Sequence, residues 1–334
     1  MKRDLSLDLL KIIAIFAVVA VHTQRCLATG ELYNPVVYYF FRFAMPLFVM
    51  CNGYLILNKD HYDFMYYKKK ILRIIVLLVT WGLVTFVYQL TLCHSPLPQA
   101  AYCGFKCTLG AYIVPFWFLF SFGLIYTILL FSFDKVKKYS KQIIIGLAIC
   151  MTIVDIISLI NIFHGGYFIQ WYVTQRLRLW TWMFYFVVGY KIKTSMHVFD
   201  KVKTPVLVVL FLVLSVMAVL YQYNLCAVYL GKINAEYCYD NAIIILWSIS
   251  FFILINRIDW EKCSDKVKRA ISVVVENCFG VFLIHSYIDH YFNFTGRVSN
   301  AFESTILWLS VFTFCLVVTY FLRKIKYVGR MFEY

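Results

Sequence analysis

The sequence predicts an all-α integral membrane protein, a polytopic bundle of about ten transmembrane helices in a single domain, residues 1–334. Two observations carry this prediction. Of the 334 residues, 62% are hydrophobic, whereas apolar residues make up roughly half of a soluble domain even when glycine is counted. The apolar residues also fall in uninterrupted runs of about 17 to 25 residues, the length of a helix that crosses a bilayer.

Ten such runs follow one another along the chain. They predict helices at residues 6–27, 36–57, 71–92, 114–133, 142–162, 176–192, 205–224, 241–256, 270–292 and 303–323. The first run is too long for the apolar h-region of a signal peptide and lacks a small-residue cleavage site, so we expect it to be retained as a helix. In the second run, Pro46 and Gly53 predict a broken or kinked helix that lines a cavity. The two longest connections, 93–113 and 224–240, are too short for a soluble domain.

The basic residues predict the orientation of the bundle. With the loops assigned alternately to two sides, 24 of the 32 Lys and Arg residues lie on one side, and only four lie on the other. Because cytoplasmic loops carry the excess of Lys and Arg, both termini are predicted to be cytoplasmic. These short loops account for the net charge of +15, so we expect no nucleic-acid partner. The basic runs 68–70 and 266–269 predict contacts with anionic membrane lipids, and binding of a phosphorylated donor is the alternative.

The eleven cysteines lie mostly inside apolar runs, where a thiol behaves as a small buried hydrophobic group. Cys103 and Cys107 flank one loop that is predicted to be outside, and Cys226 and Cys238 flank another. Disulfides in an oxidising compartment and unpaired thiols are both left open. No spacing is typical of a metal site, and we predict none.

The first predicted helix carries three ionisable residues, Asp8, Lys11 and His22. At about 1.5 Å and 100° per residue, the eleven steps from Lys11 to His22 span roughly 16 Å and return to within about 20° of the starting direction. The two side chains therefore share one face, one toward each side of the bilayer. Asp8 shares this face, and an i,i+3 ion pair with Lys11 is expected.

Other apolar runs also carry ionisable residues. Arg42, His285 and the pair Arg176 and Arg178 are predicted in the outer half of the bundle, and Glu276 nearer the cytoplasmic side. Such groups are costly in a membrane and usually line an internal path. The alternatives are interhelical hydrogen bonds for the histidines, a structural ion pair for Arg42, and snorkelling to the interface for Arg176 and Arg178.

Four separated motifs resemble the membrane-bound acyltransferase 3 family, which modifies bacterial surface glycans and other envelope molecules. The matching residues are Asp8, Leu10, Lys11 and His22; Arg42, Pro46, Leu47, Phe48, Gly53 and Tyr54; Trp117, Phe118 and Leu119; and Phe279, Gly280, Leu283 and His285. The family usually has arginine at position 11 with flanking glycines, where this chain has Leu9 and Ile12, and serine where it has Asn52. Lysine keeps the charge at position 11 but loses the planar fork that makes two parallel hydrogen bonds.

The resemblance implies transfer of an acyl group, most often acetyl, from a cytoplasmic coenzyme A thioester to a sugar hydroxyl. The implied acceptor is a lipid-linked or nascent surface glycan such as an O-antigen or capsule. Acyl-CoA would be the donor substrate, with no permanently bound cofactor, and the protein would lie in the bacterial inner membrane.

The residue types suit this chemistry. A sugar hydroxyl needs a general base with a pKa near neutral, which histidine supplies, and cations stabilise the oxyanion that forms on a thioester carbonyl. We therefore interpret His22 as the catalytic base or a transient acyl carrier, and His285 as a second acid or base. Arg42 would orient the acceptor or stabilise the oxyanion, while Lys11 with Asp8 would hold the donor. The predicted substrate-binding residues are completed by Arg176, Arg178, Trp117 and Glu276.

Two other classes of function fit part of the pattern. A polytopic glycan flippase or proton-coupled transporter also places charged residues at midplane depth, although the two halves of the chain show no matching pair of broken helices. A regulatory or scaffold membrane protein could keep the fold without catalysis. Thioester hydrolysis by the purified protein separates the enzyme from both.

Overall fold

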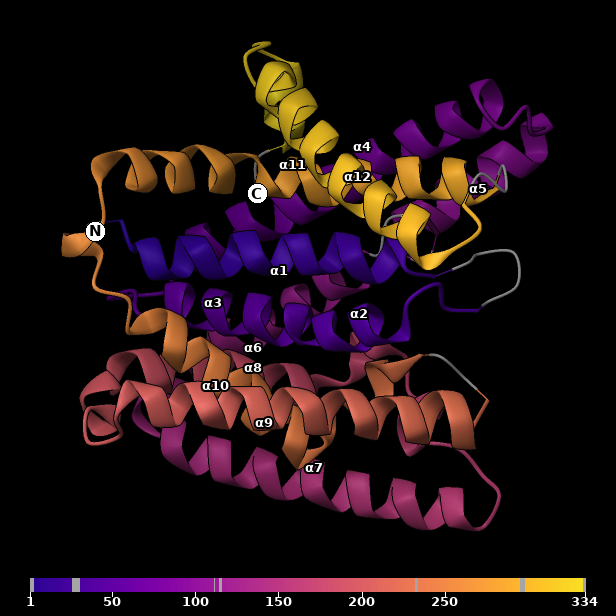
Figure 1. The fold of residues 1–334 in the computed structure, drawn as a ribbon. Helices are drawn as coiled ribbons and strands as arrows, with labels where there is room; N and C mark the ends of the chain where they lie inside the picture. Colours follow the sequence, from indigo (N-terminus) through magenta and orange to yellow (C-terminus); the bar gives the residue numbers. More distant parts are fainter. Residues whose placement is uncertain are drawn as a thin grey trace.

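The computed structural model describes residues 3–25, 31–110, 112–113, 116–231, 234–294 and 298–332. Within these residues the protein consists of helices and connecting turns with no β-strand, which confirms the predicted fold class (Figure 1). The α-helices are α1 (Leu5–Thr23), α2 (Pro35–Phe40), α3 (Ala44–Leu57), α4 (Phe64–Thr91), α5 (Leu97–Thr108), α6 (Trp117–Lys138), α7 (Ser140–Phe163), α8 (Leu179–Thr194), α9 (Thr204–Gln222), α10 (Ala242–Asn256), α11 (Asp265–Phe294) and α12 (Ala301–Leu322).

Eight segments in the described part of the chain are long and apolar enough to cross a membrane, so the protein is a multi-pass membrane protein. The other two predicted spans are shorter: α8 has 16 residues and α10 has 15. At 1.5 Å per residue each covers less than the hydrocarbon thickness of about 30 Å. Every residue from Thr181 to Gly189 is buried, as expected for a helix packed inside a bundle. By contrast, α7 and α9 are mostly exposed on the surface of the bundle.

Polar caps fix the start of several helices. The Asp4 side chain accepts hydrogen bonds from the backbone N–H groups of Ser6 and Leu7 and so begins α1. Asn34 caps α2 in the same way, with Pro35 in the first turn. These caps satisfy N–H groups that have no partner within the helix. The predicted end of the first helix, residues 26–27, lies outside the described residues.

The second predicted helix is broken, as Pro46 and Gly53 indicated, but the break comes before the proline. A 3₁₀ segment, η1 (Phe41–Phe43), separates α2 from α3. Pro46 is the third residue of α3, where a missing N–H removes no intrahelical hydrogen bond. Helix α5 was not predicted, because its sequence LPQAAYCGFKCT contains too many polar and small residues for an apolar run.

Contacts bring together the loops that the count of basic residues assigned to one side. The Lys193 ammonium lies 2.8 Å from the Asp4 carboxylate, and the Lys137 ammonium donates to the Lys59 carbonyl at 2.7 Å. At the other end of the bundle, Arg178 donates to the Glu236 carbonyl at 3.0 Å. We call these the basic end and the outer end. That the basic end faces the cytoplasm stays a prediction.

Helix α3 crosses α8 at two glycines. A β-carbon added to Gly53 would lie 1.8 Å from the Phe186 carbonyl oxygen, and one added to Gly189 would lie 2.1 Å from the Met50 carbonyl oxygen. Both neighbours are backbone atoms, which cannot rotate away. Only glycine therefore permits this approach of the two helices.

We expect Gly53→Val to destabilise the protein by about 3 kcal/mol or more, because overpacking against backbone forces the helices apart. The effect is measured as the midpoint temperature of unfolding in detergent, with the folded fraction at each temperature determined by size-exclusion chromatography. Gly146→Val is the matched control, since a β-carbon at this helical glycine of α7 meets no atom within 4 Å. Equal midpoints for the two variants would contradict the assigned helix crossing.

None of the four loop cysteines forms a disulfide in this structure. The Cys226 and Cys238 sulfur atoms lie 3.6 Å apart, which is van der Waals contact without a covalent bond. The Cys107 thiol donates a hydrogen bond to the Trp81 carbonyl at 3.6 Å. Of the two alternatives left open by the sequence, the structure has thiols and not disulfides at these positions.

Candidate functional site

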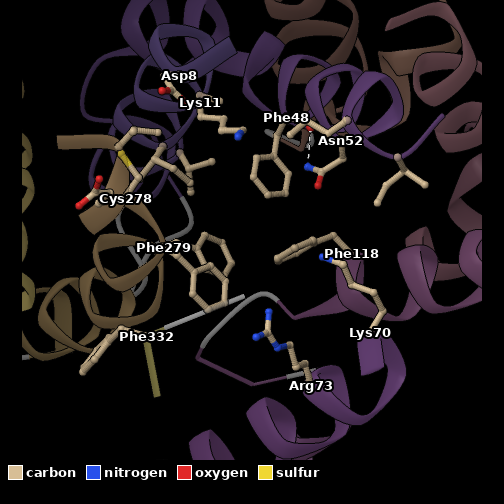
Figure 2. Close-up of a pocket in the computed structure, with 18 of the residues that line it drawn as sticks. Asp8, Lys11, Phe48, Asn52, Lys70, Arg73, Phe118, Cys278, Phe279 and Phe332 are labelled. Atoms are coloured by element: carbon tan, nitrogen blue, oxygen red, sulfur yellow. Dashed lines mark hydrogen bonds between the residues drawn. The ribbon is translucent and has the colours of Figure 1, made fainter. Parts of the chain in front are cut away.

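A cavity of about 640 Å³ opens at the basic end between α1, α3, α4, α6 and α11. We call it the inner cavity. Five of its described lining residues are basic: Lys11, Lys59, Lys70, Arg73 and Arg323. Figure 2 shows the Lys11 and Arg73 side chains extending into the same space from opposite walls, with the rings of Phe48, Phe118 and Phe279 between them. The inner cavity therefore combines a cationic rim with aromatic walls.

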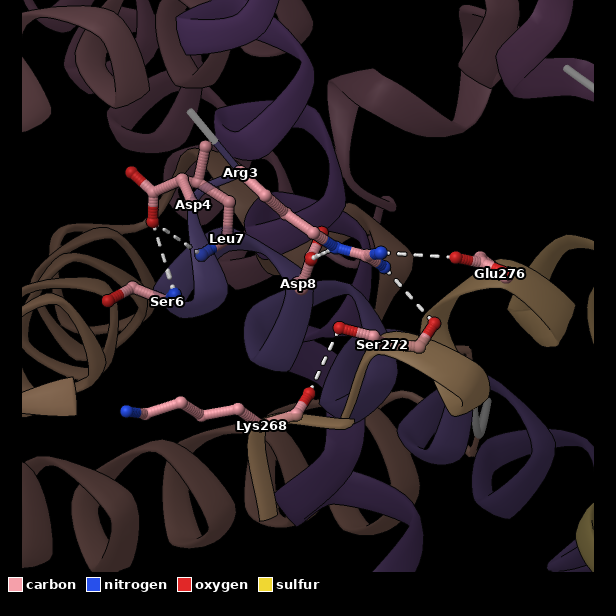
Figure 3. A network of polar contacts seen from close by, with 8 residues as sticks. All are labelled: Arg3, Asp4, Ser6, Leu7, Asp8, Lys268, Ser272 and Glu276. Atoms are coloured by element: carbon pink, nitrogen blue, oxygen red, sulfur yellow. Dashed lines mark hydrogen bonds and ion pairs between the residues drawn. The ribbon is translucent and has the colours of Figure 1, made fainter. Parts of the chain in front are cut away.

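The predicted ion pair between Asp8 and Lys11 is wrong. The Asp8 carboxylate instead accepts from Arg3 Nε at 2.6 Å, and Arg3 Nη1 reaches the Glu276 carboxylate at 3.1 Å (Figure 3). The hydrogen bond that Arg3 donates to Asp8 raises the pKa of Arg3. Arg3 precedes α1 and folds back along it, so its guanidinium forms ion pairs with Asp8 and Glu276, the two carboxylates that line the inner cavity. Within the described residues, the Lys11 ammonium has no hydrogen bond or ion pair and faces the cavity.

A second cavity, of about 300 Å³, lies toward the outer end. We call it the outer cavity. His22, Arg25 and Arg42 bring two cations and an imidazole to its wall, and Glu236 brings a carboxylate. Aromatic side chains complete the wall, among them Tyr38, Tyr239 and Trp117. This mixture of flat apolar surfaces and a few convergent polar groups is typical of small-molecule sites.

His22 and His285 lie together, with ring centroids 5.2 Å apart. His285 is fully buried, with Nδ1 3.1 Å from the Val281 carbonyl and Nε2 3.2 Å from the Ser286 hydroxyl. Because a carbonyl only accepts, Nδ1 carries the proton, and both ring nitrogens are engaged. Neither nitrogen of His22 has a hydrogen bond within the described residues, and His22 lines the outer cavity. Of the two, His22 is therefore the histidine that is available as a base.

Among the described residues, Arg42 is a buried cation that forms no ion pair with a carboxylate. It is 8% exposed, and its Nη2 donates to the Tyr38 hydroxyl at 2.7 Å, while the guanidinium carbon lies 4.5 Å from the centre of the Tyr38 ring. Its Nε has no partner among the described residues. A buried charge that lacks an opposite charge is costly, and this one lines the outer cavity. Arg42 is therefore placed to bind an anionic or strongly polar group.

Arg176 and Arg178 do not reach either cavity. Arg178 is only 3% exposed. Its three guanidinium nitrogens donate hydrogen bonds of 2.9 to 3.0 Å to the carbonyls of Val173, Glu236 and Gln170. Arg176 donates to the Leu109 carbonyl at 3.1 Å. The geometry thus gives both arginines a structural part in the outer loops and does not support the prediction that they bind substrate.

A buried carboxylate helps Arg178 to hold these loops. Asp240, the last residue of η6 (Ala235–Asp240), accepts hydrogen bonds from Gln170, Trp180 and Thr181. Burial raises the pKa of the Asp240 carboxyl, although these hydrogen bonds oppose the rise. Since η6 also carries Glu236, this network fixes one wall of the outer cavity.

The inner and outer cavities share four lining residues: Val18, Met45, Phe118 and Phe282. They come from α1, α3, α6 and α11. We call these four side chains, which lie between the adjacent cavities, the constriction. His22 lies one helical turn beyond Val18, on the outer side of the constriction. Lys11 therefore lines the cavity on one side of it, and His22 lines the cavity on the other.

Several lining residues were not predicted as site residues. In the inner cavity they include Lys59, Arg73 and Arg323, and in the outer cavity Arg25, Tyr38, Gln175, Asn234, Glu236 and Tyr239. The spacing of Lys70 and Arg73, at i and i+3 on one helix, was the available signal for the inner cavity. For Glu236 there was none, because its loop is distant in sequence from His22.

Comparison with known proteins assigns the family. Searches among curated proteins and among solved structures gave no match. A family model described as an acyltransferase domain matches residues 4–324, which includes every residue of the inner cavity except Phe332 and every residue of the outer cavity. The chain therefore belongs to the acyltransferase 3 family of membrane acyltransferases.

Proposed function

We propose that the protein is a membrane O-acyltransferase that moves an acetyl group from cytoplasmic acetyl-CoA to a hydroxyl of a bacterial surface or lipid-linked glycan. The observation that carries this proposal is the adjacency of two cavities: a cationic cavity at the basic end and an outer cavity lined by His22, whose ring nitrogens have no hydrogen bond within the described residues. A donor held in one cavity and an acceptor held in the other would meet at the constriction without either crossing the bilayer.

The inner cavity suits the donor. Coenzyme A carries its negative charge on phosphates, and charge-assisted hydrogen bonds from Lys and Arg to phosphate are among the strongest in proteins. Arg3 forms ion pairs with Asp8 and Glu276. The two carboxylates are therefore paired with Arg3, and the five cations give the inner cavity a positive electrostatic potential that attracts phosphate. The thioester arm would extend from the phosphates along the aromatic wall toward Val18.

The outer cavity suits a sugar. Faces of Trp117, Tyr38 and Tyr239 offer apolar surfaces for the C–H faces of a sugar ring. Gln175, Asn234 and Glu236 can exchange hydrogen bonds with hydroxyl groups. In the proposed reaction this cavity holds the glycan acceptor, on the extracytoplasmic side of the bacterial inner membrane.

The reaction follows from these positions. His22 accepts the proton of the sugar hydroxyl as its oxygen attacks the thioester carbonyl, and the new C–O bond forms. Arg42 stabilises the negative charge on the carbonyl oxygen, a contribution of several kcal/mol in a buried site. The C–S bond then breaks, and His22 returns the proton to the coenzyme A thiolate. His285, with both nitrogens engaged, positions the His22 ring.

The test compares surface polysaccharide from cells that contain the wild-type protein with polysaccharide from cells that lack it. We expect O-acetyl signals in the proton NMR spectrum only when the protein is present. Purified protein in lipid nanodiscs should also release free thiol from acetyl-CoA when the glycan is added. A change in the amount of exported glycan with no change in acetylation would overturn the enzyme and favour the transporter.

A further inference from the structure

We propose that the constriction formed by Val18, Met45, Phe118 and Phe282 selects the length of the transferred acyl group and admits only a chain of about two carbons. This inference rests on the proposed function. These four apolar residues would determine whether the protein uses acetyl-CoA or acyl-CoA donors with longer chains.

The constriction lies where the acyl group must pass. At about 1.5 Å per residue, Val18 lies roughly 10 Å beyond Lys11 along α1 and roughly 6 Å before His22. On α11, Phe282 lies one turn before His285, with the two ring centroids 5.8 Å apart. A thioester that enters from the inner cavity therefore meets this ring of side chains directly before the histidine pair.

Neighbouring rings hold the two phenylalanines in place. The Phe118 and Phe282 rings meet edge to face with centroids 5.1 Å apart. Phe118 also packs against Phe48 at 5.7 Å and Phe122 at 5.9 Å, and Phe282 stacks on Phe279 at 6.3 Å. Phe118 and Phe282 are both buried. Close-packed aromatic rings resist displacement, so this side of the constriction does not widen to fit a longer chain.

Selection against longer chains follows from this rigidity. Each extra methylene must displace a packed side chain, and one methylene in an apolar pocket changes specificity by roughly 10- to 200-fold. Met45 is half-buried, and its side chain is the flexible member of the ring. Shortening Met45 or Phe118 should therefore open room for a longer acyl chain without touching His22.

The experiment measures kcat/KM for acetyl-CoA and butyryl-CoA with one acceptor, using purified protein in nanodiscs. We expect the wild type to prefer acetyl-CoA by about 100-fold or more, as two added methylenes imply. Phe118→Leu and Met45→Ala should each lower this preference by about tenfold or more, by raising kcat/KM for butyryl-CoA. Phe133→Leu is the matched control: it is the same substitution farther along α6, at a buried ring that packs on Tyr62 and lines neither cavity.

The outcomes separate the inference from the function on which it rests. Transfer from acetyl-CoA and butyryl-CoA at equal kcat/KM by the wild type would overturn the selection while leaving the acyltransferase intact. An unchanged preference in both folded variants, or an equal change in Phe133→Leu, would also overturn it. Absence of transfer from every acyl-CoA would overturn the proposed function itself. Met45→Ala, at a half-buried position, keeps the test valid if Phe118→Leu does not fold.

Discussion

Replacing His22 with alanine is expected to lower kcat for acyl transfer by about 10² to 10⁴-fold, the usual contribution of a positioned general base. His22 faces the outer cavity, and neither ring nitrogen has a hydrogen bond within the described residues. Its removal takes away the proton acceptor without breaking a side-chain hydrogen bond to any described residue. The O-acetyl content of surface polysaccharide, measured by proton NMR at matched membrane levels of protein, reports the loss in cells.

The control is His164→Ala, which removes an exposed histidine at the end of α7, remote from the histidine pair. This variant should acetylate as the wild type does. A His22→Ala protein that retained full transfer would remove the base assignment. The neighbouring His285 would then be the remaining imidazole in the site.

Reversing the charge of Arg73 is expected to raise the KM for acetyl-CoA by about tenfold or more, because a charge-assisted hydrogen bond contributes roughly 1.5–3 kcal/mol. The value of kcat should change much less, since Arg73 lies at the basic end, far from His22. Steady-state kinetics of Arg73→Glu with varied acetyl-CoA and a saturating acceptor measure both constants.

Lys69→Glu is the matched control for Arg73→Glu. It makes the same change of charge on the same helix at an exposed side chain that does not line the inner cavity. If the inner cavity holds the donor, only the Arg73 variant loses affinity for acetyl-CoA. Equal losses in the two variants would mean that the general positive field of α4, and not the cavity, attracts the donor.

The sequence predicted the helices well because the bilayer imposes their length. All ten apolar runs are helical over most of their predicted extent, and only α5 was missed. Periodicity also placed Lys11 and His22 on one face of a helix, and in the structure Lys11 lines the inner cavity and His22 the outer cavity. A straight helix fixes the phase between its residues, so this prediction needed no tertiary information.

Contacts between segments that are distant in the chain could not be predicted from the sequence. Asp8 was paired with Lys11 because they are near in the helix, but Arg3 lies before the helix and reaches both Asp8 and Glu276. The role of Arg178 depends on carbonyls in two separate loops. Spacing along one helix does not reveal such partners, because they depend on how the loops fold back.

The constriction between the two cavities also bears on the membrane potential. Where cavities enter a membrane protein from both sides, the voltage falls mainly across the thin barrier between them. Moving one elementary charge through 100 mV changes the free energy by about 2.3 kcal/mol, so carrying the anionic phosphates of coenzyme A across this barrier would couple the reaction to the potential. In the proposed reaction an acetyl group passes Phe118 and Phe282 in exchange for the hydroxyl proton, and the net charge on each side of the barrier is unchanged.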